Sequence, residues 1–298
     1  MRRVCSSGDG VEVVVGIAGS GKPYALAAAR DAWVTSGFTV VGCSLAARAA
    51  KQLEQDAGIP SATLTRVLGD IERHRLPLGD TTVLVVDEAG MVGTRALARL
   101  VDHATAAGAK VVLVGDPGQL PEIDAGGAFR GLRARLGGAE LTENRRQSKA
   151  WEPRALQSLR AGDTDDAIDA YVDHERVHVA PTEQAVRDDL VNAWVRSYLE
   201  HEDVLMVAAR LADVDDLNRR ARASVRARGR LGRDEIVLAG RPYATCDQVL
   251  ALRNDYPAGV HGTRATLEQI DTTRQQLTLR STDSETVTVP FATRRPVT

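Results

Sequence analysis

Cysteine is scarce in this chain of 298 residues, which has three, Cys5, Cys43 and Cys246. Their odd number and wide spacing fit neither a disulfide framework nor the close cysteine pairs of a zinc site. The chain also lacks an apolar run of signal-peptide length before Val11, and no stretch approaches the roughly 18 apolar residues of a membrane span. We therefore expect a cytoplasmic protein with no membrane partner.

A strong charge of either sign is also missing, because 38 Lys and Arg residues nearly balance 40 Asp and Glu residues, for a formal net charge of -2. This balance gives no global attraction to nucleic acid, so DNA binding has to be argued from local motifs. Hydrophobic residues make up 43% of the chain and charged residues 26%, which is ordinary for a globular protein long enough for two domains.

Short apolar strands alternate with helix-like stretches through the first part of the chain. The strand-like segments are VEVVV (11–15), TVVGC (39–43), TTVLVVDE (81–88) and KVVLVGD (110–116). Helix-like stretches follow the first three of them, at 22–36, 45–56 and 94–107. This alternation predicts an α/β fold, in which helices cover both faces of a buried parallel sheet.

The pattern changes after Leu141. Helices rich in acidic residues and arginine are expected at about 149–172, 182–201 and 212–228, with one apolar strand, VLMVAA, at 204–209.

From Asp234 onward, short alternating segments such as TRATLEQID and QQLTLRS are separated by turn residues, as in a small β-barrel. We therefore expect three parts: an α/β lobe at 1–145, a partial second α/β lobe at 146–233 and a small β-barrel at 234–298.

The segment GIAGSGKP (16–23) matches the phosphate-binding P-loop, GxxxxGK followed by Ser or Thr, at every position except the last. Its glycines allow backbone N–H groups to surround phosphate oxygens ahead of a helix N-terminus, and Lys22 adds a charge for the β- and γ-phosphates. A glycine-rich turn is the alternative, but the segment lies between a strand and a helix, as a P-loop must. We expect ATP to be bound by Gly16, Ala18, Gly19, Ser20, Gly21, Lys22 and Pro23.

Position 23 departs from the pattern. Pro23 has neither the hydroxyl that normally binds Mg²⁺ nor a backbone N–H. Proline is tolerated in a first helical turn, yet it disfavours helical dihedrals at the preceding Lys22. We therefore expect nucleotide binding to persist while hydrolysis is impaired.

The segment VLVVDEAG (83–90) ends an apolar strand with two acids. In a P-loop ATPase the first acid, here Asp87, holds Mg²⁺, usually through water, and the second, here Glu88, orients the attacking water. The alternative is a buried strand capped by two solvated carboxylates. The P-loop upstream favours the catalytic interpretation.

Two later segments offer contacts for the γ-phosphate. In GDPGQLPEI (115–123), Gln119 has a neutral side chain able to contact a γ-phosphate, so its contacts would depend on whether that phosphate is present. The segment is also compatible with a simple proline-rich turn. In LTENRRQ (141–147), Arg145 and Arg146 suit an arginine finger, which contributes about 10³–10⁵ in rate where it operates. A salt-bridged helix entry is the alternative for this pair.

In this order and at these spacings, the four segments resemble the motifs of superfamily 1 DNA helicases of the RecD-like branch, and above all the helicase region of conjugative relaxases of the TraA and TrwC type. The resemblance extends to SLAARAAKQLE (44–54), similar to motif Ia, where Arg48 replaces the usual lysine beside single-stranded DNA. It also includes VLMVAARLADVDDLN (204–218) and LRNDYPAGVHGTRATL (252–267), the latter similar to the SH3-type insertion of the second lobe.

This resemblance implies a motor. ATP with Mg²⁺ would bind between two RecA-like lobes and drive movement 5′ to 3′ along single-stranded DNA, which is held through phosphates and stacked bases. Gln119 and Arg146 would couple the γ-phosphate to lobe closure. The implied partners are single-stranded DNA and a relaxase domain or other conjugation proteins.

The chain lacks the family's glutamine segment before the P-loop and the histidine-glutamine-glycine motif after the SH3-like insertion. We expect it to be a fragment of a larger protein. A catalytically dead remnant that still binds nucleotide or DNA is the alternative to an active ATPase. A P-loop kinase acting on a small molecule is a third interpretation, against which Gln119 and the arginine pair argue.

Two other features carry less weight. The arginine-dense stretch at 218–233 would suit phosphate contacts, but a solvated helix face explains it more simply. His174 and His178 have the i, i+4 spacing of helical metal ligands, yet they flank an expected strand start, where that spacing does not converge on one ion.

Overall fold

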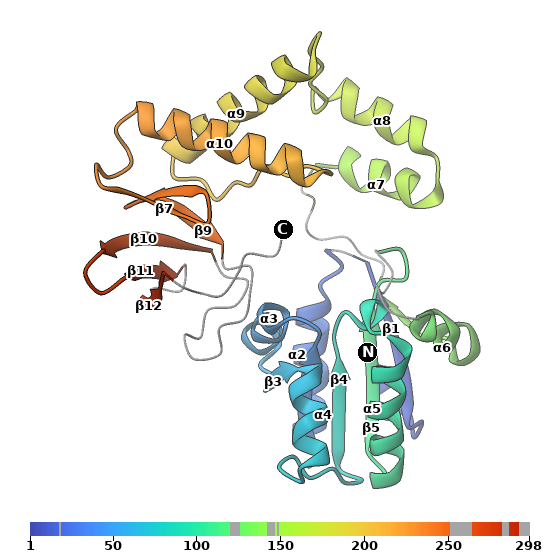
Figure 1. Cartoon of the computed structure of the whole chain (residues 1–298). Coiled ribbons are helices and arrows are strands. Elements are labelled where there is room, and N and C mark those ends of the chain that lie inside the picture. The colour runs from blue at the N-terminus through green and yellow to red at the C-terminus, as the bar shows by residue number, and fades with distance from the viewer. Residues whose placement is uncertain are drawn as a thin grey trace. The chain divides into compact units, whose positions relative to one another are not determined.

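The computed structural model describes residues 1–17, 19–119, 126–141, 147, 149–250, 264–281 and 286–291. The chain forms two compact units, Met1–His174 and Glu175–Thr298 (Figure 1). Among the described residues, no helix is long and apolar enough to cross a membrane.

The first unit is built on a six-stranded sheet with the strand order β3-β2-β4-β5-β1-β6, and every neighbouring pair is parallel. The strands are β1 (Val11–Gly16), β2 (Thr39–Ser44), β3 (Ser61–Thr63), β4 (Thr82–Val86), β5 (Lys110–Gly115) and β6 (Ala139–Leu141). The α/β fold with a parallel sheet, predicted from the alternation of strands and helices, is confirmed.

Helices cover both faces of this sheet. They are α1 (Arg2–Ser6), α2 (Lys22–Thr35), α3 (Ala47–Ala57), α4 (Leu64–Glu72), α5 (Thr94–Ala107) and α6 (Ala128–Leu136). Successive residues of β4 point to opposite faces, so Leu84 and Val86 join the apolar cluster under α4, α5 and α6, whereas Val83 and Val85 join the cluster under α1, α2 and α3. Burial on both faces explains why the central strands are mainly apolar, although β1 also contains the buried Glu12.

A helical hairpin of α7 (Trp151–Ala161) and α8 (Thr164–Asp173) completes the first unit. The single helix expected at about 149–172 is therefore wrong. Gly162 ends α7 in the left-handed conformation, with φ of 95°, which glycine adopts at little cost. Trp151 joins the two helices by stacking on His174, with ring centroids 4.1 Å apart.

The second unit begins with two helices, α9 (Glu183–Leu199) and α10 (Leu211–Ala227), which pack through a small apolar cluster that includes Val191 and Leu217. Antiparallel strands follow. They are β7 (Glu235–Leu238), β8 (Arg241–Ala244), β9 (Gln248–Leu250), β10 (Arg264–Asp271), β11 (Gln276–Ser281) and β12 (Thr286–Pro290).

The predicted short β-segments of this region are thus present. In the part of the chain that is described, they form the hairpin β7–β8 and a four-stranded sheet in the order β12-β11-β10-β9. Leu267 and Leu279 of the larger sheet share one apolar cluster with Ile236 and Tyr243 of the hairpin. The division of the chain at residues 145 and 233 stays a prediction.

The strand expected at 204–209 is wrong, because these residues are assigned to no strand. Met206 and Ala208 pack against the cluster between α9 and α10, while Leu205 and Val207 are 69% and 85% exposed. This is the alternation typical of a strand, but a strand also needs a hydrogen-bonded neighbour, and none pairs with this segment among the described residues.

Candidate nucleotide-binding site

Three neighbouring strands of the first sheet carry the candidate site at their carboxyl ends. β1 pairs with β5 and β5 pairs with β4, all in parallel. The P-loop follows β1, the acidic pair follows β4, and the segment GDPGQLP begins at the end of β5. Segments far apart in sequence therefore meet at the carboxyl ends of these strands, which is where ligands bind in open α/β sheets.

The loop between β1 and α2 has the backbone conformation of a tight phosphate-binding turn. Gly19 and Gly21 have φ of 81° and 73°, a region that glycine enters without steric cost. Gly16 leaves room for the lysine stem, because a Cβ atom there would lie 2.6 Å from Cγ of Lys22. The helix α2 begins at Lys22, so its unpaired first N–H groups lie beside the loop.

Lys22 connects the P-loop to the acidic pair. Its Nζ atom donates a hydrogen bond to the carbonyl of Gly16 at 3.2 Å and lies 3.6 Å from Oε1 of Glu88. The lysine side chain is only 12% exposed, so its charge is largely shielded from water. A buried ammonium group at this point suits the oxygens of a triphosphate.

Pro23 lies in the first turn of α2 without displacing the start of that helix. The sequence led us to expect that it would disfavour a helical Lys22, but α2 begins at this residue. The first N–H groups of a helix have no intrahelical acceptor, so a proline here costs no hydrogen bond. What Pro23 still cannot provide is the hydroxyl that holds Mg²⁺ in other P-loops.

Two buried oxygen atoms at the site, Oγ of Ser20 and Oδ1 of Asp87, have no hydrogen-bond partner among the described residues. Such atoms are rare in folded proteins and call for an explanation. Hydroxyl and carboxylate oxygens are the ligands that Mg²⁺ prefers. The residues present therefore fit a hydrated Mg²⁺ ion, with Asp87 as the anionic group that would hold it.

The surroundings of Asp87 oppose its negative charge. Burial, together with the charge of Glu88, raises the pKa of the Asp87 carboxyl, although the backbone N–H of Glu88 and the charge of Lys22 partly compensate. Burial and Asp87 in turn raise the pKa of the Cys43 thiol to about 12. Glu88 itself has a positive φ of 52°, which is unusual for a residue with a side chain and is found at strained functional positions.

Replacing Asp87 by asparagine is expected to stabilise the metal-free protein by about 1 kcal/mol, or about 2–4 °C in Tm. The pKa of Asp87 is raised in the folded state, so the ionised carboxyl opposes folding at neutral pH. The gain should vanish at acidic pH, where the carboxyl is protonated in the folded and unfolded states alike. Thermal unfolding in EDTA across the pH range measures it.

The exposed Asp80 provides the matched control, because Asp80→Asn removes the same charge outside the site. Equal Tm changes for the two variants at neutral pH would contradict the argument.

The turn after β5 is organised by Asp116, a residue that the sequence did not single out. Asp116 is 3% exposed, and its Oδ1 atom accepts a hydrogen bond from the backbone N–H of Gly118 at 2.9 Å. Both of its carboxylate oxygens accept from Arg160 of α7, at 2.8 and 2.7 Å. Burial opposes ionisation of this carboxyl, but the hydrogen bonds from Arg160 and Gly118 and the charge of Arg160 lower its pKa.

Close backbone contact links this turn to the acidic pair. A Cβ atom on Gly115 would lie 2.9 Å from the backbone nitrogen of Gly90, and one on Gly90 would lie 3.3 Å from the carbonyl oxygen of Asp116. Glycine at both positions therefore allows the segment after β4 to touch the segment after β5. Gln119, which is half-buried, lies in this same turn.

The remaining predicted residues are placed as follows. Ala18, Arg145 and Arg146 lie outside the described residues. Arg48 is exposed near the start of α3. The structure brings together Lys22, Asp87 and Glu88.

The arginine-dense stretch lies on α10 and the residues after it, and several of its guanidinium groups are paired with carboxylates. Arg220 contacts Asp216 and Asp188, and Arg222 contacts Asp247 and Glu235. These pairs favour the structural interpretation of the stretch over phosphate binding.

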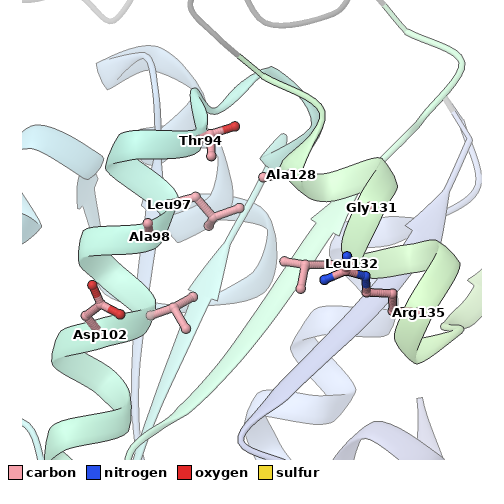
Figure 2. Close-up of a pocket in the computed structure, with 9 residues that line it drawn as sticks. Thr94, Leu97, Ala98, Asp102, Ala128, Gly131, Leu132 and Arg135 are labelled. Carbon is pink, nitrogen blue, oxygen red and sulfur yellow. The ribbon is translucent and has the colours of Figure 1, made fainter.

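A shallow groove of about 410 Å³ lies between α5 and α6. Figure 2 shows that mainly apolar side chains such as Leu97 and Leu132 line it, with Asp102 on α5 and Arg135 on α6. None of its lining residues belongs to the P-loop or to the acidic pair. The groove is therefore separate from the candidate site.

Comparisons with known proteins found one matching family and several relatives. Residues 1–182 match a family described as AAA domain. The chain is 38% identical over 253 residues to the conjugal transfer protein TraA of Rhizobium radiobacter, and 39% identical over 259 residues to the probable conjugal transfer protein TraA of Sinorhizobium fredii. Each match covers 84% of this chain and 23% of the relative.

A third relative is the ATP-dependent RecD2 DNA helicase of Deinococcus radiodurans, which is 32% identical over 146 residues, covering 48% of this chain and 20% of the helicase. The chain thus spans less than a quarter of the length of these three relatives.

Proposed function

Because the chain belongs to the AAA domain family and is related to TraA proteins and RecD helicases, we propose that it binds ATP with Mg²⁺ and couples ATP hydrolysis to movement along single-stranded DNA. One observation carries the proposal. Lys22 of the P-loop lies 3.6 Å from Glu88 at the end of β4, and this proximity supports a single site for the phosphate-binding and water-activating roles that we assign to them.

Each group at the site has a role in this proposal. Backbone N–H groups of the P-loop and Nζ of Lys22 bind the β- and γ-phosphates. Asp87 would hold a hydrated Mg²⁺, which would neutralise charge on the phosphate oxygens when bound. Glu88 accepts a proton from the water that attacks the γ-phosphate. Gln119 contacts the γ-phosphate from the neighbouring turn.

The finer parts of the proposal rest on the resemblance of the motifs. Arg145 and Arg146 stabilise the transferring phosphoryl group, and Arg48 lies along single-stranded DNA. Residues 1–145 form the ATPase lobe, 146–233 part of a second helicase lobe and 234–298 an SH3-like insertion. The relatives named TraA are conjugal transfer proteins, so we place the activity in conjugative DNA transfer, with a relaxase domain or other transfer proteins as partners.

A nucleotide- or DNA-binding module without hydrolysis is the second candidate. Pro23 favours it, because the site lacks the P-loop hydroxyl that holds Mg²⁺. The two candidates differ in one measurable respect. An active motor hydrolyses ATP faster when single-stranded DNA is present, whereas a binding module shows no turnover with or without DNA.

The test is ATP turnover by the purified chain with and without single-stranded DNA, together with the binding of a non-hydrolysable ATP analogue. Lys22→Met is expected to lower analogue affinity about 10- to 50-fold, because it removes a charged hydrogen-bond donor to the phosphates. Titration by calorimetry measures this.

The exposed Lys149 is the matched control, and Lys149→Met should leave analogue affinity unchanged. Equal affinities for the unaltered protein and Lys22→Met would contradict the assignment of the P-loop. Analogue binding without any turnover would support the binding module.

A further inference from the structure

A bidentate ion pair joins α7 to the turn that carries Gln119. The two guanidinium nitrogens of Arg160 donate to the two carboxylate oxygens of Asp116 at 2.8 and 2.7 Å. The Asp116 side chain is fully buried, and the Arg160 side chain is 38% exposed. Two parallel bonds fix the relative orientation of the planar groups as well as their distance, which a single contact does not.

The turn is shaped to admit this guanidinium group. A Cβ atom on Gly118 would lie 2.7 Å from Nη2 of Arg160, so a larger residue at position 118 would push the arginine away. The backbone N–H of Gly118 also donates to Asp116. Arg130 of α6 holds the same turn more loosely, through one bond of 3.0 Å to the carbonyl of Pro117.

The conformation of this turn determines where Gln119 lies. The backbone N–H of Gln119 donates to the carbonyl oxygen of Asp116 at 3.2 Å. That same carbonyl oxygen would lie 3.3 Å from a Cβ atom on Gly90, in the segment that begins with the acidic pair. Asp116 therefore contacts both the residue proposed to contact the γ-phosphate and the backbone beside Glu88.

We propose that Arg160 is a positioning residue for the nucleotide site. Through its ion pair with Asp116, Arg160 fixes the turn in which Gln119 faces the γ-phosphate. The α7–α8 hairpin thereby affects how well the site distinguishes ATP from ADP. The inference rests on the proposed function, because it assumes that the site binds a nucleoside triphosphate. A displacement of α7 would break the pair and alter the position of Gln119.

The experiment compares the affinities of the full chain for ADP and for a non-hydrolysable ATP analogue, with Tm as a check on folding. Arg160→Ala is expected to lower analogue affinity about tenfold while ADP affinity changes less than about twofold. Arg160→Lys keeps the charge but not the two parallel bonds, so we expect a smaller loss of analogue affinity. Arg154→Ala, at an exposed position of α7, should change neither affinity.

A double-mutant cycle separates positioning from a general structural effect. Gln119→Ala should cause the same selective loss of analogue affinity, and adding Arg160→Ala should cause little further loss, because both changes act through one side chain. Additive losses of analogue affinity in the double variant would overturn the proposal. If Arg160→Ala fails to fold, Arg160→Lys takes its place, because lysine keeps a charged partner for Asp116. Equal losses of affinity for ADP and for the analogue in Arg160→Lys would also overturn the proposal. Absence of ATP turnover in the unaltered protein would instead contradict the proposed motor activity. The comparison of ADP and analogue affinities would still be valid, because it does not depend on turnover.

Discussion

Replacing Glu88 by glutamine is expected to lower kcat for ATP hydrolysis about 10²- to 10⁴-fold while the affinity for an ATP analogue changes less than about threefold. Glutamine keeps the size of the side chain but cannot accept the proton of the attacking water. It also keeps an oxygen near Nζ of Lys22, which lies 3.6 Å from Oε1 of Glu88 in the structure. Steady-state turnover and calorimetric binding on the same preparations measure the two quantities.

Glu54→Gln is the matched control for this variant, because Glu54 is exposed in the last turn of α3 and belongs to neither the P-loop nor the acidic pair. It should leave both kcat and analogue affinity unchanged. Residual turnover that is identical in the unaltered protein and Glu88→Gln would show that Glu88 is not the catalytic base, and would favour a contaminating ATPase or a binding module.

The parallel sheet and its helices were predictable because the signals that specify them are local. Each central strand is a short, mainly apolar run that is buried on both faces, and a helix-like stretch follows three of the four in the sequence. The P-loop needs only glycines at fixed spacing between such a strand and a helix. Strand order is different, because it depends on which strands pair. The sequence did not predict that β5 lies between β1 and β4, which brings Lys22 close to Glu88.

The errors occurred where structure depends on distant partners. Residues 204–209 alternate as a strand does, but no strand among the described residues pairs with them, so the segment is not a strand. The pairing of Asp116 with Arg160 joins residues 44 positions apart, and neither residue stands out locally. Gly162 is the exception, because a glycine inside an expected helix was a local signal that could have predicted the break between α7 and α8.

The arginine-dense stretch illustrates the limit of composition. Arginine pairs equally well with DNA phosphates and with carboxylates of the same unit. Only the fold shows which carboxylates lie beside these arginines, namely Asp188, Asp216, Asp247 and Glu235. A residue that is already paired has to break that pair before it can bind a phosphate. Local charge density is therefore a weak predictor of a nucleic-acid site when acidic residues are equally common.

Replacing Pro23 by threonine is expected to raise Mg²⁺-dependent ATP hydrolysis about 100-fold, because it restores the P-loop hydroxyl that holds the metal. The change should be compatible with the fold, since Pro23 lies in the first turn of α2, where threonine is also accepted. The measurement is kcat as a function of Mg²⁺ concentration, and the concentration of Mg²⁺ that gives half the maximal rate should fall as well.

Pro23→Ala separates the two properties in which proline differs from threonine. Alanine restores the backbone N–H that proline lacks, but it supplies no hydroxyl. If the missing ligand limits hydrolysis, Pro23→Thr should be fast and Pro23→Ala as slow as the unaltered protein. Equal acceleration by both variants would instead place the limit in the backbone of the loop. Unchanged rates in both would show that position 23 does not limit hydrolysis.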